Sequence, residues 1–280
     1  MKDGLLKGKK GIIFGALNNK SIAWQVALKA RQHGAELVLT NSPVAVRMGT
    51  IHELAKLTSG KVIVADATSM VDIDRLVSES MEIFGGRFDF ILHSIGMSPN
   101  VRKAIPYENT SYENMLKTFD ISALSFHRIL QTTYKYDAIN EWGSVVALSY
   151  VAAQRTLSGY NDMGDAKALL ESIARSFGYI YGRDRKVRIN TISQSPTPTT
   201  AGSGVHGMES LLDFSERMSP LGNATAEECA DYCVALFSDL TRKVTMQNLY
   251  HDGGFSSMGM SLRAIEQYQK SFEDCDCNEK

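Results

Sequence analysis

Tyr160 and Lys167 are the side chains in this 280-residue sequence whose types and spacing best suit acid–base chemistry. They lie seven positions apart, and at about 100° per residue this is roughly two helical turns, so a helix would carry both on one face. A lysine in that position can hold ligand hydroxyl groups, while its charge favours the anionic side of a tyrosine's chemistry. Tyr150, shortly before, offers a second phenol. The same spacing also occurs by chance on solvated helix faces, so its meaning depends on the surrounding elements.

Seven apolar, β-rich runs alternate with helical patterns along the chain. The predicted strands are Gly11–Phe14, Glu36–Thr40, Val62–Ala65, Phe88–His93, Ser144–Ser149, Val187–Ile192 and Gln247–His251. The predicted helices lie near 21–33, 47–58, 70–84, 111–137, 158–181 and 225–238. Strands that are apolar on both faces and separated by helices predict a parallel sheet covered on both sides. We therefore predict one α/β domain over residues 1–280, a Rossmann-type doubly wound seven-stranded parallel sheet with helices on both faces.

The loop after the first predicted strand has some features of a dinucleotide site. Gly15 permits a tight turn, and Ser21 and Ile22 open the next helix, whose free amides and dipole suit a pyrophosphate. The full G-x-G-x-x-G pattern is absent, because only Gly15 is present. Taken alone, the loop fits a dinucleotide site and an ordinary turn equally well.

The ends of the second and third strands bear on cofactor choice. The second strand ends in Thr40-Asn41-Ser42, which offers no basic partner for a 2′-phosphate and favours NADH. The nearest basic residue is Arg47, expected about one turn into the following helix. At the end of the third strand, Asp66 can accept a hydrogen bond from an adenine amino group or cap the next helix, and both readings stay open.

Two further stretches stand out. After the fourth strand, Gly96 would let the backbone approach a cofactor, whereas His93 is expected to be packed in the core. Residues 194–217 begin with Pro, Ser, Thr and Gly and later regain helical character. A long irregular segment of this kind inside a compact domain is typical of a functional lid. A polar tail is expected at about 270–280.

Composition excludes several classes of partner and site. The chain is 44% hydrophobic and 22% charged, with a net charge of −1, so neither nucleic acid nor a membrane is expected as a partner. The basic N-terminus has no apolar stretch after it that would make a signal peptide, which predicts a cytoplasmic protein. The four cysteines do not have the usual metal-ligand spacing, so no metal site is expected.

Several motifs together resemble the bacterial enoyl-acyl-carrier-protein reductases, a divergent branch of the short-chain dehydrogenases. The resemblance runs from Gly8 to about Phe255. Ordinary short-chain dehydrogenases use Tyr-x3-Lys, and here Met163 occupies the position of that tyrosine. The motifs that carry the resemblance are Gly15 with Ser21-Ile22-Ala23, His93-Ser94-Ile95-Gly96, Leu148-Ser149-Tyr150, Tyr160 with Lys167, and His251-Asp252-Gly253-Gly254-Phe255.

The resemblance implies how NADH is held. Its pyrophosphate would lie at Gly15, Ser21 and Ile22, and its adenine near Asp66 and Ala67. Ser42 would lie close to the ribose, Ile95 would pack under the ring system, and Lys167 would hold ribose hydroxyls. The nicotinamide and phosphates would contact the segment Thr197, Pro198, Thr199, Thr200 and Ala201.

The resemblance also implies the reaction. Hydride would pass to the β-carbon of a trans-2-enoyl thioester, the last step of the fatty-acid elongation cycle. The enolate oxygen would accept a hydrogen bond from Tyr160 while Lys167 stabilises the developing charge, and Tyr150 would line the same pocket. Ser98 and Val205 would contact the substrate. Which tyrosine matters more for protonation, and the preferred acyl length, cannot be read from the sequence.

Two departures from the family pattern affect the lid. Many members carry lysine and arginine just after its Gly-Val or Gly-Ile pair, whereas this chain has His206-Gly207-Met208-Glu209. This places in doubt a docking site there for the acidic acyl carrier protein, the expected partner. The segment Ser193–Thr200 also replaces the commoner Ser-Ala-Gly-Pro. A homotetramer is expected from the resemblance alone.

Two alternative functions remain open at this point. One is a keto- or hydroxy-group oxidoreductase on the same fold, and the other is a catalytically inactive, dinucleotide-binding regulator.

Overall fold

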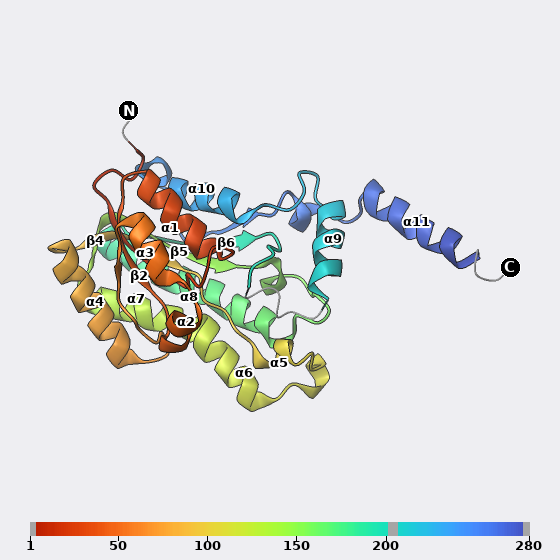
Figure 1. The fold of residues 1–280 in the computed structure, drawn as a ribbon, viewed down its shortest axis with the longest axis horizontal. Coiled ribbons are helices and arrows are strands. Elements are labelled where there is room, and N and C mark those ends of the chain that lie inside the picture. Colours follow the sequence, from red (N-terminus) through yellow and green to blue (C-terminus); the bar gives the residue numbers. More distant parts are fainter. Residues whose placement is uncertain (1–3, 201–206, 277–280) are drawn as a thin grey trace.

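A seven-stranded parallel sheet forms the centre of the computed structural model, which describes residues 4–200 and 207–276 (Figure 1). The strand order is β3-β2-β1-β4-β5-β6-β7, so the chain reverses its direction of winding between β1 and β4. This confirms the predicted fold class. The strands are β1 Lys10–Phe14, β2 Glu36–Thr40, β3 Lys61–Val62, β4 Phe88–His93, β5 Ile139–Ser149, β6 Arg188–Gln194 and β7 Asn248–His251.

Helices cover both faces of the sheet and bury its apolar side chains. On one face α1 packs beside α10, and Phe90 of β4 stacks on Phe237 with ring centroids 4.5 Å apart. On the other face α4, α7 and α8 enclose a core that includes Phe126 and Leu170. The α-helices are α1 Ile22–Gln32, α2 Pro43–Met48, α3 Ile51–Thr58, α4 Met70–Phe84, α5 Pro99–Arg102, α6 Tyr112–Phe119, α7 Ser125–Lys135, α8 Asn161–Arg185, α9 Met208–Met218, α10 Ala226–Phe237 and α11 Leu262–Asp276. Because both faces are covered, the central strands are buried almost throughout rather than exposed at every second residue, and β6 buries several polar side chains as well.

Several predicted elements differ in detail, among them the fifth strand, which begins at Ile139 rather than at Ser144. The helix expected at 47–58 is two helices, α2 and α3, because the chain turns at Gly49 and Thr50, where the Thr50 N–H donates to the Leu17 carbonyl at 2.8 Å. The helix expected at 111–137 contains a π-helical turn over Asp120–Leu124 between α6 and α7. The third strand pairs with β2 only at Lys61–Val62, although Ile63 and Ala65 still donate single hydrogen bonds to Leu39 of β2 and to Asn41 just after it.

The C-terminal part continues beyond the sheet as a helix. The stretch expected to be a polar tail is helical up to Asp276, and Figure 1 shows α11 extending away from the body of the molecule. Within the described residues, every helix is too short or too polar to cross a membrane.

Candidate active site

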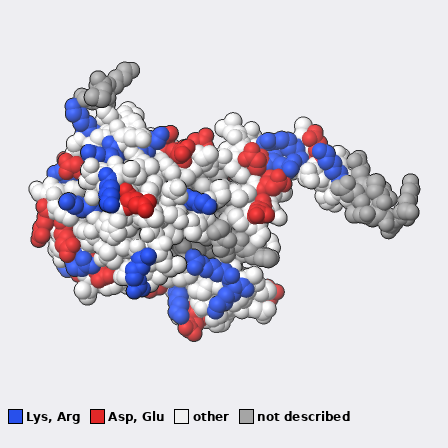
Figure 2. All heavy atoms as spheres, in the orientation of Figure 1, with Lys and Arg blue, Asp and Glu red and all other residues white. Residues whose placement is uncertain are grey.

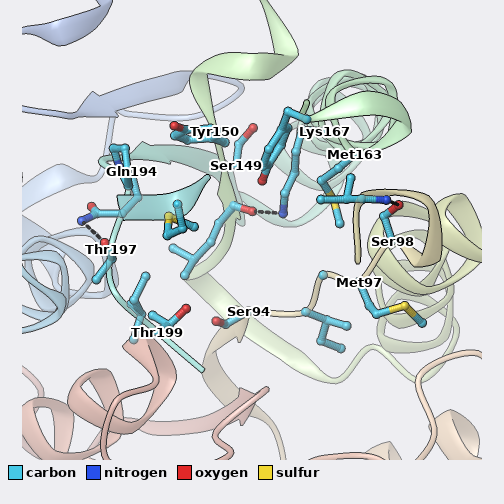
Figure 3. A pocket seen from close by; sticks show the side chains of 18 of the residues that line it. Ser94, Met97, Ser98, Ser149, Tyr150, Met163, Lys167, Gln194, Thr197 and Thr199 are labelled. Carbon is cyan, nitrogen blue, oxygen red and sulfur yellow. Dashed lines mark hydrogen bonds between the residues drawn. The ribbon is translucent and has the colours of Figure 1, made fainter. Parts of the chain in front are cut away.

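One cavity opens at the carboxyl ends of the central strands. Strand register places Phe14 of β1, Thr40 of β2 and His93 of β4 side by side, so the loops that follow these strands meet at one edge. In Figure 3 the labelled side chains surround an open space there. The cavity is lined by Ile22, Ser94, Ile95, Gly96, Met97, Ser98, Val101, Arg102, Leu148, Ser149, Tyr150, Tyr160, Met163, Lys167, Gln194, Ser195, Pro196, Thr197, Thr199, Met208 and Leu211.

Two phenols lie together on this cavity. The rings of Tyr150, directly after β5, and Tyr160, directly before α8, have centroids 5.0 Å apart and planes inclined by 55°. Burial raises the pKa of both phenols well above the usual value, so both are protonated donors at neutral pH. The Tyr150 hydroxyl is buried and has no hydrogen-bond partner among the described residues. A buried donor without a partner favours a ligand oxygen at this place.

Lys167 contributes a buried cation to the same cavity. Its Nζ donates to the Leu148 carbonyl at 2.7 Å, a bond drawn in Figure 3. Burial lowers the Lys167 pKa from 10.5 to about 8, and the negative charge of Glu171, one helical turn further along α8, partly opposes this shift. A Cβ built on Gly96 would lie 3.7 Å from Nζ, so the loop after β4 passes close to the lysine. Lys167 is therefore mostly charged at neutral pH and faces the cavity with protons left to donate.

The position of Tyr160 is fixed by the two residues that follow it. Asn161 has a φ of 41°, and its side-chain amide donates to the Ile105 carbonyl at 2.6 Å. The Asp162 carboxylate is fully buried and accepts three hydrogen bonds from the segments before and within α6. Their donors are Ser98 Oγ at 2.6 Å, Asn100 Nδ2 at 2.9 Å and Thr118 Oγ1 at 2.8 Å. These bonds tie the start of α8 to the loop that forms another wall of the cavity.

The loop after β1 has the geometry of a phosphate cradle. Gly15 has a φ of 96°, and a Cβ there would lie 2.0 Å from the Ser94 carbonyl oxygen, so the close approach of the two loops requires glycine. The Ser21 hydroxyl accepts from the N–H groups of Leu17 and Asn18 at 3.1 and 3.2 Å, which holds the loop in shape. The first N–H groups of α1, beginning at Ile22, have no intrahelical acceptor. Together these features fit the pyrophosphate of a dinucleotide.

Side-chain hydrogen bonds hold the segment that follows β2 in place. Asn41, after β2, donates to the Ala16 carbonyl at 3.1 Å and accepts from the Ser42 N–H at 2.9 Å. Ser42 in turn caps α2, with its hydroxyl accepting from the Ala45 N–H. Arg47 lies in the last turn of that short helix, about one turn from its start as expected, and its side chain is exposed.

Asp66 does not cap α4. Its carboxylate accepts from the N–H and the hydroxyl of Thr68 at 2.9 and 2.8 Å, and the cap of α4 is Ser69. The helix-cap reading of Asp66 is therefore wrong, because an Asx turn places Ser69 between the aspartate and the helix. His93 is packed, as expected: it is fully buried, bonds Ser125 through Nε2 at 2.8 Å, and has a pKa lowered to about 3 by burial and by the charge of Lys167.

The cavity brings together eight of the residues that the family resemblance assigns to catalysis, cofactor or substrate. These are Ile22, Ile95, Ser98, Tyr150, Tyr160, Lys167, Thr197 and Thr199. The others assigned by the resemblance within the described residues do not line it: Gly15, Ser21, Ser42, Asp66, Ala67, Pro198 and Thr200. Thr200 still joins two loops, because the Asn18 side-chain amide donates to its hydroxyl at 2.9 Å. Ala201 and Val205 lie outside the described residues.

Sequence reasoning missed part of the wall. Met97, Val101 and Met163 form an apolar side of the cavity, and Met208 and Leu211 of α9 add to it. Met163 carried a signal, since it occupies the position of the tyrosine in ordinary short-chain dehydrogenases. The short α5, which brings Val101 and Arg102 to the site, could not be recognised in the sequence, because four residues are too few to show helical periodicity.

Comparison with known proteins identifies similar chains. The sequence profile described as Enoyl-(Acyl carrier protein) reductase matches residues 15–256. The enoyl-[acyl-carrier-protein] reductase [NADH] 1 of Rhizobium meliloti is 34% identical over 92% of this chain and 93% of its own. The FabI form from Rickettsia bellii is 35% identical over 92% and 98%. The crystal structure of a FabI–NADH complex from Alistipes finegoldii superimposes with a TM-score of 0.92 at 69% identity, over 93% of this chain and 92% of that one.

Proposed function

The chain belongs to the enoyl-[acyl-carrier-protein] reductase family, and from this premise we propose a role for each residue of its active site. It is an NADH-dependent oxidoreductase of fatty-acid biosynthesis that reduces the double bond of enoyl thioesters carried on acyl carrier protein. This assignment of roles is based on one observation: Tyr150, Tyr160 and Lys167 all line the same cavity, which also has an apolar wall.

We propose that the loops at the carboxyl ends of β1 to β4 hold NADH. The tight turn at Gly15, braced by Ser21, and the free amides at Ile22 support a pyrophosphate site. Ser42 lies beside the adenosine ribose, and Asp66 and Ala67 beside the adenine.

The nicotinamide end lies nearer the cavity. Ile95 would pack under the ring, and the segment Thr197 to Ala201 would hold the nicotinamide and phosphates. The lining positions of Ile95, Thr197 and Thr199 support this placement, whereas Ala201 lies outside the described residues. When bound, NADH supplies the hydride for the β-carbon of the substrate.

Tyr160 and Lys167 act on the thioester oxygen. Tyr160 donates a hydrogen bond to that oxygen, and its raised pKa keeps the phenol protonated until negative charge develops there. Lys167 donates to ribose hydroxyls, and its positive charge stabilises the enolate in a buried setting where charges interact strongly. Tyr150 offers a second donor from the adjacent ring.

The acyl chain lies against the apolar wall. Met97, Val101 and Met163 supply methyl and methylene surface without polar groups, which suits a hydrocarbon chain. Ser98 contacts the substrate through its backbone, since its hydroxyl is committed to Asp162. Val205 is assigned to substrate on the family resemblance and lies outside the described residues.

The segment 194–217 acts as a substrate lid in this proposal. Its helix α9 places Met208 and Leu211 on the cavity, and residues 201–206 of the segment lie outside the described residues. Closure of α9 over a bound acyl chain would exclude water from the site of hydride transfer.

A homotetrameric assembly and a cytoplasmic location complete the proposal. Exposed apolar side chains such as Tyr112, Leu116 and Tyr179 on α6 and α8 offer surface that an oligomer could bury. Cys229 and Cys233 are buried free thiols, which suits a reducing compartment.

Isotope transfer tests the reaction assignment. With NADH deuterated at C4 and a trans-2-enoyl thioester, mass spectrometry of the product should locate deuterium at the β-carbon of the acyl chain. Deuterium in an alcohol carbon, or none in the acyl product, would contradict the proposed reaction.

A further inference from the structure

The cavity mouth has two sides of opposite charge. On one side is α5, where Arg102 lines the cavity and Lys103 follows it, both exposed. On the other side is α9, whose charged residues are Glu209, Asp213, Glu216 and Arg217, a net charge of −2. Figure 2 shows Lys and Arg side chains gathered where Figure 1 places α5 and α6, and acidic side chains over α9.

The cations on the α5 side are not neutralised by ion pairs of their own. None of the ion pairs among the described residues involves Arg102 or Lys103. Glu113 of α6 bonds Lys117 at 2.9 Å, and its pKa is lowered by that lysine and, more weakly, by Lys103. Glu108 lies on the segment between α5 and α6, so the three cations Arg102, Lys103 and Lys117 and the two carboxylates of Glu108 and Glu113 leave a net charge of +1 on this side. On α9, by contrast, the single arginine already bonds Asp213 at 2.8 Å.

We propose that the acyl carrier protein docks on the α5 side of the mouth, with Arg102 and Lys103 contacting its acidic surface and the phosphate of its prosthetic arm. The inference rests on the proposed function, which makes a carrier-linked thioester the substrate. The carrier protein is acidic, so the positive side attracts it while the acidic α9 repels it. Docking there also brings the prosthetic arm to the cavity over Arg102. Among the described residues that line the cavity, Arg102 and Lys167 are the charged ones.

The charge pattern explains a feature of the lid that the sequence left open. The stretch after Gly204 carries Met208 and Glu209 where many family members have lysine and arginine. In this chain the basic docking residues stand on the opposite side of the same mouth. The arm then enters from α5, and α9 is free to contribute Met208 and Leu211 to the apolar wall.

The test compares one enoyl chain on two carriers. Steady-state kinetics are measured with the enoyl group on acyl carrier protein and on N-acetylcysteamine, which has neither the protein nor the phosphate. For the Arg102→Ala/Lys103→Ala variant, the ratio of kcat/KM on the carrier protein to kcat/KM on N-acetylcysteamine should fall about tenfold, mainly through KM. The dependence of that ratio on salt concentration should weaken in the same variant, because screening acts on the contacts it lacks.

Two control variants make the comparison specific. Lys56→Ala/Lys61→Ala removes the same charge from exposed positions on α3 and β3, and its ratio should stay within about twofold of wild type. Arg102→Lys/Lys103→Arg keeps both charges and should restore the ratio. An unchanged ratio in the alanine variant, or an equal fall in the distant control, overturns the docking proposal. Failure of the wild type to reduce the N-acetylcysteamine thioester would instead contradict the proposed function.

Discussion

Replacing Lys167 with methionine should stabilise the fold at neutral pH while weakening NADH binding. Burial lowers the Lys167 pKa from 10.5 to about 8, so the folded chain binds this proton less tightly than the unfolded chain. At about 1.4 kcal/mol per pKa unit, the shift opposes folding by roughly 3 kcal/mol at pH 7. Methionine has a similar unbranched shape and no charge, and it loses the hydrogen bond to the Leu148 carbonyl, worth about 1 kcal/mol. The expected net gain is therefore about 2 kcal/mol.

The stability difference between the wild type and Lys167→Met should depend on pH in a defined direction. The destabilisation is fully present below the folded pKa of about 8 and disappears above the unfolded value of 10.5, where neither state is protonated. Between about pH 7 and about pH 9.5, the wild type should therefore gain about 2 kcal/mol in free energy of unfolding relative to Lys167→Met. Guanidinium chloride unfolding, followed by circular dichroism on both proteins, measures this difference, and other titrating groups cancel in the comparison. A difference that stays constant across this range would refute the account of a buried, desolvated ammonium.

Three other expectations follow from the same site. Tyr160→Phe should lower turnover of enoyl thioesters by about a hundredfold while leaving NADH affinity, measured by fluorescence titration, within about twofold; full retained activity would remove the phenol from its assigned role. Asp162→Ala leaves three buried donors without their acceptor, so it should lower the free energy of unfolding by about 3 kcal/mol or more. The control variant Asp165→Ala, one turn further along α8, should change the free energy of unfolding by less than about 1 kcal/mol. Equal effects of the two variants would contradict the anchoring role of Asp162. Amide hydrogen exchange in α9, Met208–Met218, should slow when NADH and an acyl ligand are both bound, and equally strong protection without ligand would show a fixed helix rather than a lid.

The sheet could be predicted because its strands are buried on both faces. The run Phe88–His93 is mainly apolar and too short for an amphipathic helix, and the structure has that strand with the same bounds. The bounds of the third strand were predicted less exactly, because it lies at the edge of the sheet and pairs with only one neighbouring strand. Only Lys61–Val62 form the ladder with β2, while the Ile63 N–H donates to the Leu39 carbonyl of β2 and the Ala65 N–H donates to the Asn41 carbonyl just after it. The register of this edge strand depends on such single hydrogen bonds, and these bonds produce no hydrophobic pattern in the sequence.

The site could be predicted only where one element carries the pattern. Lys167 and Tyr160 are separated by two turns of one segment, and both line the cavity, although Tyr160 stands just before α8 rather than within it. Asp162 could not be recognised as a buried anchor, because its donors come from distant segments of the chain. A carboxylate at the start of a helix is ordinarily solvated, and only the folded chain shows that three donors enclose it.

The central claim is that this cavity directs hydride to a carbon–carbon double bond rather than to a carbonyl group. Oxidation of NADH by the purified protein should be followed with a trans-2-enoyl thioester and, in parallel, with a 3-ketoacyl thioester of the same chain length and carrier. The account predicts rapid, enzyme-dependent NADH oxidation with the enoyl thioester and none above background with the ketoacyl thioester. Oxidation with the ketoacyl thioester alone, or with neither substrate, would contradict it.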